Sequence, residues 1–439
     1  MFINRTNELQ ALEDEYNKKT ATFSVVYGRR RVGKTALLSK YIENKSSIYL
    51  YITLSDLHSQ LLAFTQQIKK FTPPTLSKYL KFENFEEAFE FLATLELEEK
   101  LVLVVDEYQY LTQLDKGFSS KLQRLWDMAL CNSNIHLILC GSVLSMMHSE
   151  VLAYNAPLYG RRTSQFHIKA IKFNYLKEFL PKCSKLELMQ IYASFGTIPK
   201  YLNEYDSSLS FMQNIESKIL NKNSYLYSEG NFLLKDEISD ARSYFSILES
   251  ISKGNSKIGH IGTSLGLTSS HLSKYMQRLI ELDIVEKEIP ITEVNPLKSK
   301  FGRYKIKDKF LNFWFFYIHK NYNYLEIEQR KAVLDEIDMN FNDRFVSFAF
   351  EDYVVEDILQ NPQKYLDFIP KKVGRWWNNK EEIDIVAFDD ENIAFIECKW
   401  QNRVDEESVK YKLIEKTTNI KHTKKASYLV VTKSFYLEG

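Results

Sequence analysis

Short apolar runs alternate with longer amphipathic stretches over the first 170 residues. Four of these runs have the length of a strand: residues 22–27, 47–53, 101–105 and 135–140. A continuous apolar run is typical of a strand that is buried on both faces, as in a parallel sheet. The stretches between the runs have the length and polarity of helices. This alternation predicts an α/β domain with a parallel sheet at residues 1–170.

The pattern becomes helical after residue 170. Residues 171–235 are predicted to be helices, interrupted by a turn at 196–199. Three short helices and two strands are then predicted at 244–252, 258–265, 269–282, 284–291 and 303–306. Either Thr268 or Ser269 is expected to be the N-cap of the third helix. Three helices followed by a β-hairpin predict a winged helix-turn-helix, which occupies residues 236–325 together with an aromatic-rich helix.

The last hundred residues return to an α/β pattern. A helix is predicted at 343–359, strands near 373–377, 383–388 and 393–398, and then a further helix and strand. The sequence therefore predicts four domains: an α/β core at 1–170, a helical lid at 171–235, the winged helix at 236–325 and a C-terminal α/β domain at 335–439.

Charge and composition narrow the classes of function. The 439 residues include 58 basic and 57 acidic side chains, so no global field draws the protein to nucleic acid. Residues 251–310, however, carry 11 basic and six acidic residues, a local excess that suits contact with phosphates. The four cysteines have no CxxC spacing, and neither a signal peptide nor an apolar stretch of membrane-spanning length is apparent. We therefore expect a cytoplasmic protein with reduced thiols and no membrane partner.

The segment GRRRVGKT at residues 28–35 fits the pattern GxxxxGK[ST] in full and lies between a predicted strand and a predicted helix. Its glycines permit a tight loop whose backbone N–H groups point at phosphate oxygens. Lys34 is expected to reach the β- and γ-phosphates of ATP, and the hydroxyl of Thr35 to bind Mg²⁺. The residues predicted to bind the nucleotide are Gly28, Arg29, Arg30, Arg31, Val32, Gly33, Lys34, Thr35 and Ala36.

The apolar run 101–105 ends in Asp106 and Glu107, as in a Walker B motif. Asp106 is expected to hold Mg²⁺, and Glu107 to act as the catalytic base that polarises the attacking water. The alternative is a buried strand that ends in two surface carboxylates.

Three further side chains are candidates for the same site. Ser142 follows the next apolar strand and could position the water, although an ordinary strand-end turn is the alternative. Arg161 and Arg162 follow Gly160, and one of them could reach the γ-phosphate as an arginine finger, in the same or a neighbouring subunit. The alternative for both arginines is a surface salt bridge.

A second group of charged residues lies near the C-terminus. Asp384, Glu397 and Lys399 have the spacing D-x12-E-x-K of a PD-(D/E)xK nuclease, with Glu351 as a candidate third carboxylate. Two acidic side chains can bind Mg²⁺, which activates a water and stabilises the phosphate transition state. Lys399 could orient that water. The alternative is a pair of amphipathic strands with charged solvent faces, since this spacing often arises by chance.

Several segments together resemble a known family. GRRRVGKT, LVVDEYQYL, LILCGS, APLYGRRT and GTIPKYL are similar to motifs of prokaryotic AAA-type P-loop ATPases, and VGRWW, EEIDIVAF and IAFIECKW resemble the C-terminal block of the larger members. The resemblance implies a P-loop NTPase of the ASCE/AAA type with a helical lid, a winged helix and a restriction-endonuclease-like domain. It also places Ser142 at the sensor position. One departure is Thr197, where the family usually has a second glycine.

The third helix of the predicted winged helix would be its recognition helix. Three of its polar residues, Ser270, Lys274 and Gln277, are expected to share a face, and His271 lies beside them. The alternative is that the winged helix serves only as a spacer between proteins. Likewise, Trp376 and Trp377 could stack on bases or belong to the core.

These features predict Mg²⁺-dependent ATP hydrolysis coupled to a nuclease-like domain that acts on or near DNA. The alternative is a nucleotide-dependent signalling or scaffolding switch with a catalytically silent nuclease fold. A homo-oligomer or another protein is a candidate partner in either case.

Overall fold

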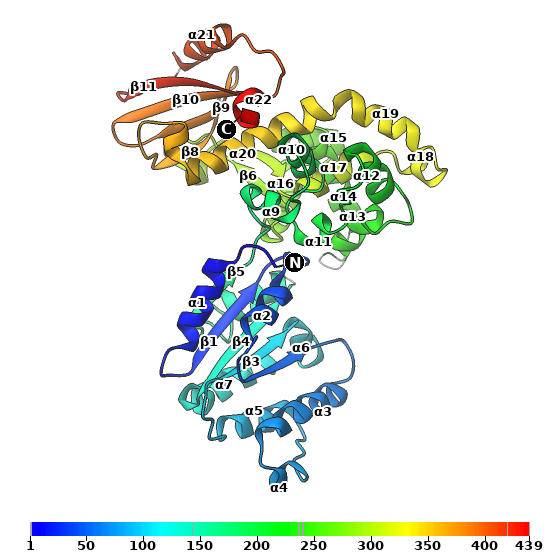
Figure 1. The fold of residues 1–439 in the computed structure, drawn as a ribbon, viewed down its shortest axis with the longest axis vertical. Coiled ribbons are helices and arrows are strands. Elements are labelled where there is room, and N and C mark those ends of the chain that lie inside the picture. The colour runs from blue at the N-terminus through cyan, green and yellow to red at the C-terminus, as the bar shows by residue number, and fades with distance from the viewer. Residues whose placement is uncertain (1, 143, 236–237, 239–240, 419, 439) are drawn as a thin grey trace. The chain divides into compact units, whose positions relative to one another are not determined.

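The structure, a computed structural model, describes residues 2–142, 144–235, 238, 241–418 and 420–438 (Figure 1). The chain divides into two compact units, Met1–Ile171 and Lys172–Gly439. The predicted boundary between the lid and the winged helix falls at residues 236–237, outside the described residues.

The first unit is built on a five-stranded parallel sheet with the strand order β2-β3-β4-β1-β5. The strands are β1 (Thr22–Tyr27), β2 (Ser47–Tyr51), β3 (Leu101–Asp106), β4 (Ile135–Gly141) and β5 (Ser164–His167). Every residue of β3 and β4 is buried, as their continuous apolar runs predicted. The predicted α/β parallel sheet is therefore confirmed.

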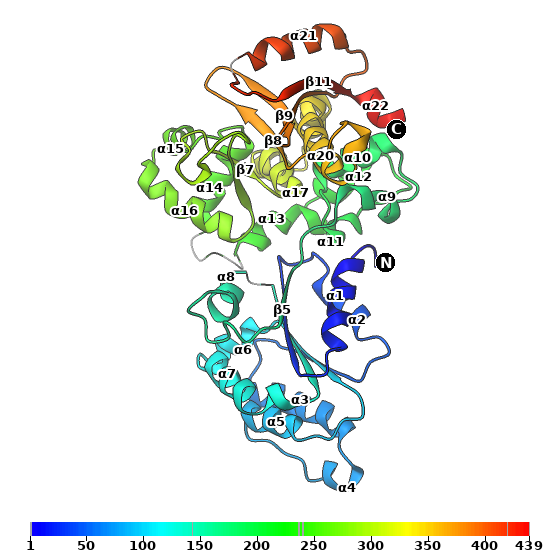
Figure 2. The same cartoon turned by 90° about the vertical axis from the view of Figure 1, so that its left-hand side faces the viewer.

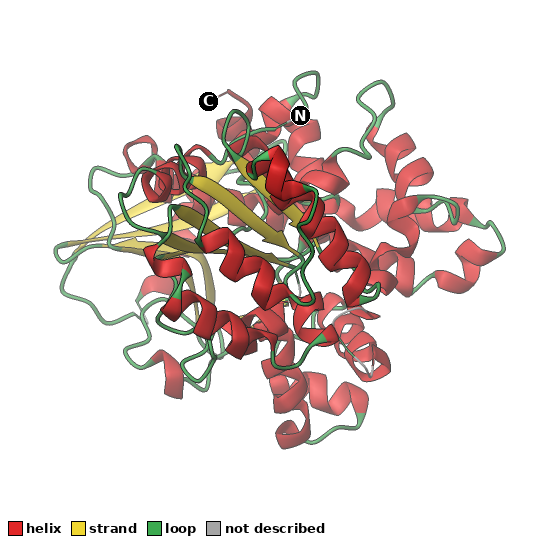
Figure 3. Cartoon of the chain, turned by 90° about the horizontal axis from the view of Figure 1, so that it is seen from below, coloured by secondary structure: helices red, strands yellow, loops and turns green. Residues whose placement is uncertain are grey.

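Helices cover both faces of this sheet, as the red ribbons on either side of the yellow strands show (Figure 3). Along each strand, alternate side chains point to opposite faces. Val26 and Val104 pack with α1 (Thr6–Tyr16) and α2 (Lys34–Tyr41) on one face. The alternate residues Val25, Leu103 and Val105 of the same strands pack with α3 (Leu57–Ile68), α5 (Phe85–Ala93) and α7 (Phe118–Met128) on the other face. Shorter helices of this unit are α4 (Pro74–Ser77), α6 (Gln109–Leu114) and α8 (Leu144–Met147).

The second unit begins with helices. They are α9 (Leu176–Phe179), α10 (Lys185–Ser194), α11 (Pro199–Leu202), α12 (Phe211–Asn214) and α13 (Tyr225–Lys235). Three more helices and an antiparallel hairpin follow: α14 (Ala241–Ser252), α15 (Ile258–Leu265), α16 (Ser269–Glu281), β6 (Val285–Glu288) and β7 (Arg303–Ile306). Thr268 is the N-cap of α16, because its side chain accepts a hydrogen bond from the backbone N–H of His271. The first hairpin strand is shorter than predicted and stops before Pro290, which has no N–H to donate.

Aromatic-rich helices connect the hairpin to the C-terminal part of the unit. They are α17 (Lys309–Phe313), a π-helical turn (Trp314–His319), α18 (Tyr322–Glu326) and α19 (Arg330–Phe341). Another π-helical turn, Asn342–Val346, joins α19 to α20 (Ser347–Gln360), so residues 330–360 form one continuous helical stretch.

The C-terminal residues form a four-stranded sheet with the order β11-β10-β9-β8. Its elements are β8 (Lys372–Trp377), β9 (Glu382–Phe388), β10 (Asn392–Lys399), α21 (Glu406–Thr417), β11 (Lys425–Thr432) and α22 (Lys433–Glu438). Strands β8, β9 and β10 are antiparallel, whereas β11 returns through α21 to pair in parallel with β10. Helices α20 and α21 cover opposite faces (Figure 2). In the described part of the chain, no helix has both the length and the apolar character needed to cross a membrane.

Candidate functional site

Three strand ends meet at one edge of the first sheet. Strand β4 lies between β1 and β3, and all three run in parallel. The segments that follow them therefore lie side by side. These segments begin with Gly28 after β1, Asp106 and Glu107 at the end of β3, and Ser142 after β4. The topology thus brings together the motifs that the sequence separates by more than one hundred residues.

The loop at residues 28–33 is shaped by its glycines. A Cβ on Gly28 would lie 2.2 Å from the backbone oxygen of Ile168, so the close approach of this strand requires glycine. Gly33 has a φ of 95° and is the N-cap of α2. Its left-handed backbone turns the chain directly into the helix, whose N-terminal end favours negative charge.

Lys34 folds back onto this loop. Its Nζ donates to the backbone oxygens of Gly28 at 2.8 Å and Arg29 at 2.9 Å. The side chain is buried, and burial lowers the pKa of Lys34 while the nearby carboxylates of Glu107 and Asp106 oppose that shift. An ammonium group held beside the loop in this way is placed to bind an anion.

The other loop residues differ in their surroundings. Val32 is buried in the core beneath the loop, whereas Thr35 and Ala36 are exposed at the start of α2. The guanidinium of Arg30 donates to the hydroxyl of Tyr110 at 2.9 Å, which ties the loop to α6.

Asp106 and Thr35 are in direct contact. The Thr35 hydroxyl donates to Oδ2 of Asp106 at 3.0 Å, and the backbone N–H of Glu107 donates to Oδ1 at 2.9 Å. The hydroxyl of Tyr49, on β2, donates to the same Oδ2 at 2.5 Å. The two predicted Mg²⁺ ligands are therefore neighbours, and this pair of a carboxylate and a hydroxyl is the donor set of hard oxygen atoms that Mg²⁺ prefers. The sequence analysis did not predict Tyr49. The only sequence feature that could have indicated it is a hydroxyl-bearing side chain within an apolar strand, β2, which pairs with β3.

Glu107 is held from the opposite side. Its φ of 56° lies in the left-handed region, which lets the chain turn sharply after β3. Its Oε2 accepts a hydrogen bond from the Ser142 hydroxyl at 2.7 Å and another from the Gln109 amide. The sequence predicted Ser142 at this site but missed Gln109.

The two candidate finger arginines lie on the surface of the first unit. The Arg161 guanidinium pairs with Asp127 at 3.1 Å and donates to the backbone oxygen of Tyr159. Arg162 donates to the backbone oxygen of Val151 at 3.0 Å and lies over the Tyr159 ring. In this structure both arginines are engaged with their own unit.

The second candidate site surrounds a β-bulge in the C-terminal sheet. Between the pairs Gly374–Val386 and Trp376–Ile383, one residue of β8, Arg375, faces two residues of β9, Asp384 and Ile385. Bulges of this kind redirect side chains.

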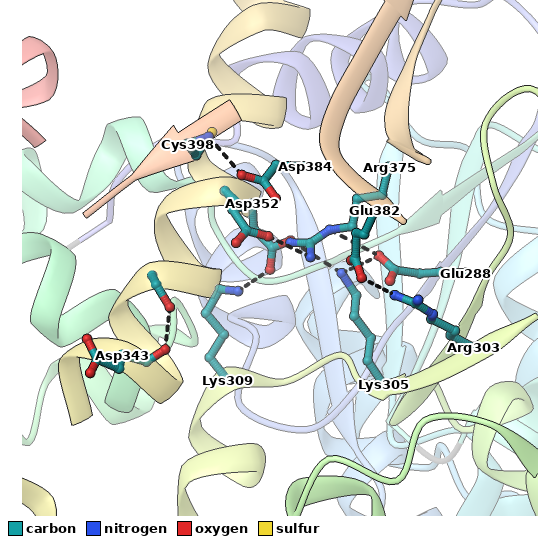
Figure 4. Close-up of polar contacts among 12 residues, drawn as sticks. Glu288, Arg303, Lys305, Lys309, Asp343, Asp352, Arg375, Glu382, Asp384 and Cys398 are labelled. Carbon is teal, nitrogen blue, oxygen red and sulfur yellow. Dashed lines mark hydrogen bonds and ion pairs between the residues drawn. The ribbon is translucent and has the colours of Figure 1, made fainter. Parts of the chain in front are cut away.

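The bulged carboxylate lies near the next strand. Oδ2 of Asp384 accepts a hydrogen bond from the backbone N–H of Cys398 at 2.8 Å (Figure 4). Burial and the nearby charge of Glu397 raise the pKa of Asp384 to about 6. The Lys399 ammonium lies 2.9 Å from Oε1 of Glu397, so the three motif residues lie close together. Lys416 of α21, which was not predicted, also contacts both oxygens of Glu397, at 3.1 and 3.2 Å.

Glu351 has a different partner. The guanidinium of Arg375 lies 2.7 Å from Oε2 of Glu351 and 2.9 Å from Oδ1 of Asp352. Burial raises the pKa of Glu351 to about 8, the positive charge of Arg375 opposes this shift, and Asp384 adds to it. Within the described ranges, no group of three or more His, Cys, Asp and Glu side chains has the arrangement of a metal site.

An ion-pair network joins the hairpin to this sheet. Lys305 of β7 lies 2.7 Å from Glu288 and 3.3 Å from Asp352, and Arg303 lies 2.7 Å from Glu382 (Figure 4). Lys309 pairs with Asp352 as well. These residues line a cavity of about 450 Å³ in which cationic and anionic side chains are paired with one another.

Backbone contacts extend this connection. The N–H of Ile291 donates to the Arg375 backbone oxygen at 2.9 Å, and the indole N–H of Trp377 donates to the Phe301 backbone oxygen at 2.8 Å. Trp376 and Trp377 are 7% and 2% exposed, so both belong to the packed interior.

The predicted recognition helix, α16, has two distinct faces. Leu272, Met276 and Leu279 are buried against the rest of the unit. The four polar candidates lie on exposed positions: Ser270, His271, Lys274 and Gln277.

In the second unit, the turn at Gly196 has a φ of 69°, and a Cβ there would lie 3.5 Å from the backbone nitrogen of Phe310.

The chain is similar to known proteins along most of its length. Residues 2–205 match the family described as an ATPase domain predominantly from Archaea, and residues 314–412 match archaeal and bacterial proteins of unknown function. An uncharacterized protein of Methanocaldococcus jannaschii is 37% identical over 408 residues, 92% of this chain and 89% of that protein. An uncharacterized ATP-binding protein of the same organism is 53% identical over 45 residues, 10% of this chain and 76% of that protein.

A solved structure shares the fold. The Walker-type ATPase of Pyrococcus abyssi aligns with a TM-score of 0.51 at 19% identity, over 72% of this chain and 96% of that chain. Together with the sequence matches and the geometry of the loop at residues 28–35, this likeness leads to one assignment: the chain belongs to the P-loop ATPase family found predominantly in Archaea.

Proposed function

We propose that the first unit binds and hydrolyses ATP with Mg²⁺. The observation that carries this proposal is the contact between Thr35 and Asp106 beside the phosphate-binding loop, with Glu107 anchored next to them. Nucleotide binding at such a loop follows from its backbone N–H groups and from the adjoining helix end.

Each residue has a distinct role in the proposed reaction. Lys34 leaves the loop carbonyls and binds phosphate oxygens, while Thr35 and Asp106 hold Mg²⁺, which neutralises charge that develops on the phosphates. Glu107 accepts the proton of the attacking water. Arg161 or Arg162 would need to release its present contacts to act as a finger, and a finger supplied by a neighbouring copy requires a multimer.

The test uses two substitutions in the full chain. Glu107→Gln should retain ATP binding but lower turnover by about 100-fold or more, because a neutral amide cannot accept the proton. Lys34→Ala should weaken ATP binding itself. Glu98→Gln is the matched control: Glu98 is exposed and precedes the other end of β3, so its variant should hydrolyse ATP at the normal rate. Normal turnover by Glu107→Gln would exclude Glu107 as the base.

The oligomeric state tests the finger separately. Measuring the mass of the protein with ATP bound distinguishes a multimer, which permits a finger in trans, from a monomer, which excludes one.

We propose further that α14, α15, α16 and the hairpin act as a winged helix and that the C-terminal sheet is a nuclease-like module that acts on DNA. The proximity of Asp384, Glu397 and Lys399 supports phosphodiester cleavage. The contacts of Glu351 with Arg375 and of Glu397 with two lysines favour the second candidate, a catalytically silent module of a nucleotide-dependent switch.

DNA incubated with the protein, Mg²⁺ and ATP separates these two functions. Cleavage that is lost in Asp384→Ala and kept in Asp390→Ala, an exposed position beyond the same strand, supports the nuclease. The absence of both cleavage and salt-dependent DNA binding supports the switch. Because the hairpin is tied to β8, we expect either module to move with the hairpin as one body.

A further inference from the structure

Gln109 lies directly against the carboxylate of Glu107. It is the first residue of α6, and its side chain is fully buried. Its Nε2 donates to Oε2 of Glu107 and lies 3.3 Å from the Ser142 hydroxyl, which donates to the same Oε2. Three side chains thus form a closed network around one carboxylate oxygen.

The position of this amide is energetically unfavourable for its oxygen. Its Oε1 is buried without a hydrogen-bond partner among the described residues, a situation that is uncommon in native proteins. Oε1 also lies in a crowded place, because a Cβ on Gly141 would be 2.2 Å from Sδ of Met147 and 2.8 Å from Oε1. The amide oxygen of Gln109 therefore gains no hydrogen bond from this position. The amide nitrogen does, because it donates to Glu107.

We propose that Gln109 is a positioning residue for ATP hydrolysis. Together with Ser142 it holds Oε2 of Glu107 and leaves the other carboxylate oxygen to accept the proton of the attacking water. This inference rests on the proposed role of Glu107 as the base. A glutamate side chain loses rotamer freedom when it is held in one geometry, and a base that is already held need not be ordered at each turnover. Gln109 acts through Glu107.

Gln109→Met tests the proposal in the full chain, because methionine keeps the length of the side chain and removes the donor. We expect kcat to fall about 10- to 100-fold, a part of what a general base contributes. The KM for ATP and the affinity for a non-hydrolysable ATP analogue should change less than about twofold. A general packing defect would alter these two values as well as kcat. Gln113→Met is the control, since Gln113 is exposed on the same helix.

Two more variants keep the test decisive. Gln109→Asn draws the donor away from Glu107 while preserving polarity, and should lower kcat in the same way if Gln109→Met folds poorly. Ser142→Ala removes the other donor, and the double variant should lose less than the product of the two single effects, because both donors hold one oxygen. Unchanged or faster turnover in the Gln109 variants, with Glu107→Gln inactive, overturns the positioning role alone. An active Glu107→Gln variant overturns the proposed function instead.

Discussion

His136 is a histidine held neutral in the core of the first unit. It lies on β4, where Nε2 is 2.7 Å from the Ser24 hydroxyl and Nδ1 is 2.9 Å from the Tyr41 hydroxyl. Burial lowers the pKa of His136 to about 3, and the positive charges of lysines at the sheet margin add to this effect. His136 therefore stays neutral in the folded protein at pH values below 6.5, where the same side chain binds a proton in the unfolded chain.

This histidine should make stability fall in acid. Between pH 6.5 and about 3 the unfolded chain binds one more proton at this site, so its contribution to the free energy of unfolding decreases as the pH falls. From pH 7 to pH 5 we expect a loss of about 2 kcal/mol. His136→Asn should remove this part of the pH dependence in urea unfolding, although it lowers stability at pH 7. The exposed His58→Asn should leave the slope as it is. An equal slope in both variants would contradict the prediction.

Sequence motifs identified those site residues whose role can be recognised from the residues next to them in the chain. Residues 28–36, Asp106 and Glu107 were found because strand, loop and helix signals adjoin them. Tyr49 and Gln109 were missed, since their roles depend on which strands become neighbours in the sheet and on which way a side chain points. Lys416 was missed for the same reason: only the packing of α21 on the C-terminal sheet brings it to Glu397.

At the scale of elements, α13 and the turn after α17 pack through a glycine. A Cβ on Gly230 would lie 2.4 Å from the Trp314 ring, whose indole N–H donates to the backbone oxygen of Tyr227 at 2.8 Å. Both residues are buried, so neither side has room to move.

Gly230→Ala should therefore lower the free energy of unfolding of the second unit, by about 1–3 kcal/mol, the usual cost of overpacking. Gly259→Ala is the control, because a Cβ on this residue of α15 meets no other atom within 4 Å. Its higher helix propensity should leave the protein equally or slightly more stable. Thermal unfolding followed by circular dichroism compares the two, and a stable Gly230→Ala variant would show that Trp314 can shift.

The elements that the sequence predicted well are those with long, uniform patterns. Strands β3 and β4 were recognised from their unbroken apolar runs. Strand β5 was missed because its four residues, Ser-Gln-Phe-His, alternate in burial at the edge of the sheet and show no such run. The bulge at Asp384 was also invisible, since it arises from the register between two strands and not from either strand alone.

At the scale of the whole molecule, Arg375 joins parts of the second unit that are distant in the sequence. It contacts Glu351 and Asp352 of α20, and Asp352 in turn pairs with Lys305 of the hairpin. The side chains of Arg375 and Glu351 are 11% and 12% exposed, so this pair has little access to water.

Above pH 8, where Glu351 is charged, Arg375→Ala should destabilise the second unit by about 3–5 kcal/mol, because the Glu351 carboxylate is left buried without its partner. Replacing Glu351 by Gln in the same chain should restore part of this loss. Lys371→Ala removes an exposed ion pair with Asp390 and should leave the unfolding midpoint unchanged. Denaturant unfolding measures all three, and a small effect of Arg375→Ala would mean that water reaches Glu351.

The hydrogen bond from Ile291 to Arg375 has a consequence for the solubility of fragments. Strand β8 is the last strand of its sheet, and such a strand offers unpaired backbone groups to other chains. The segment that follows β6 occupies part of this edge, and Phe301 accepts the indole N–H of Trp377. A fragment that starts at residue 335 lacks this cover and should aggregate through β8. A fragment that starts at residue 172 retains the cover and should stay monodisperse.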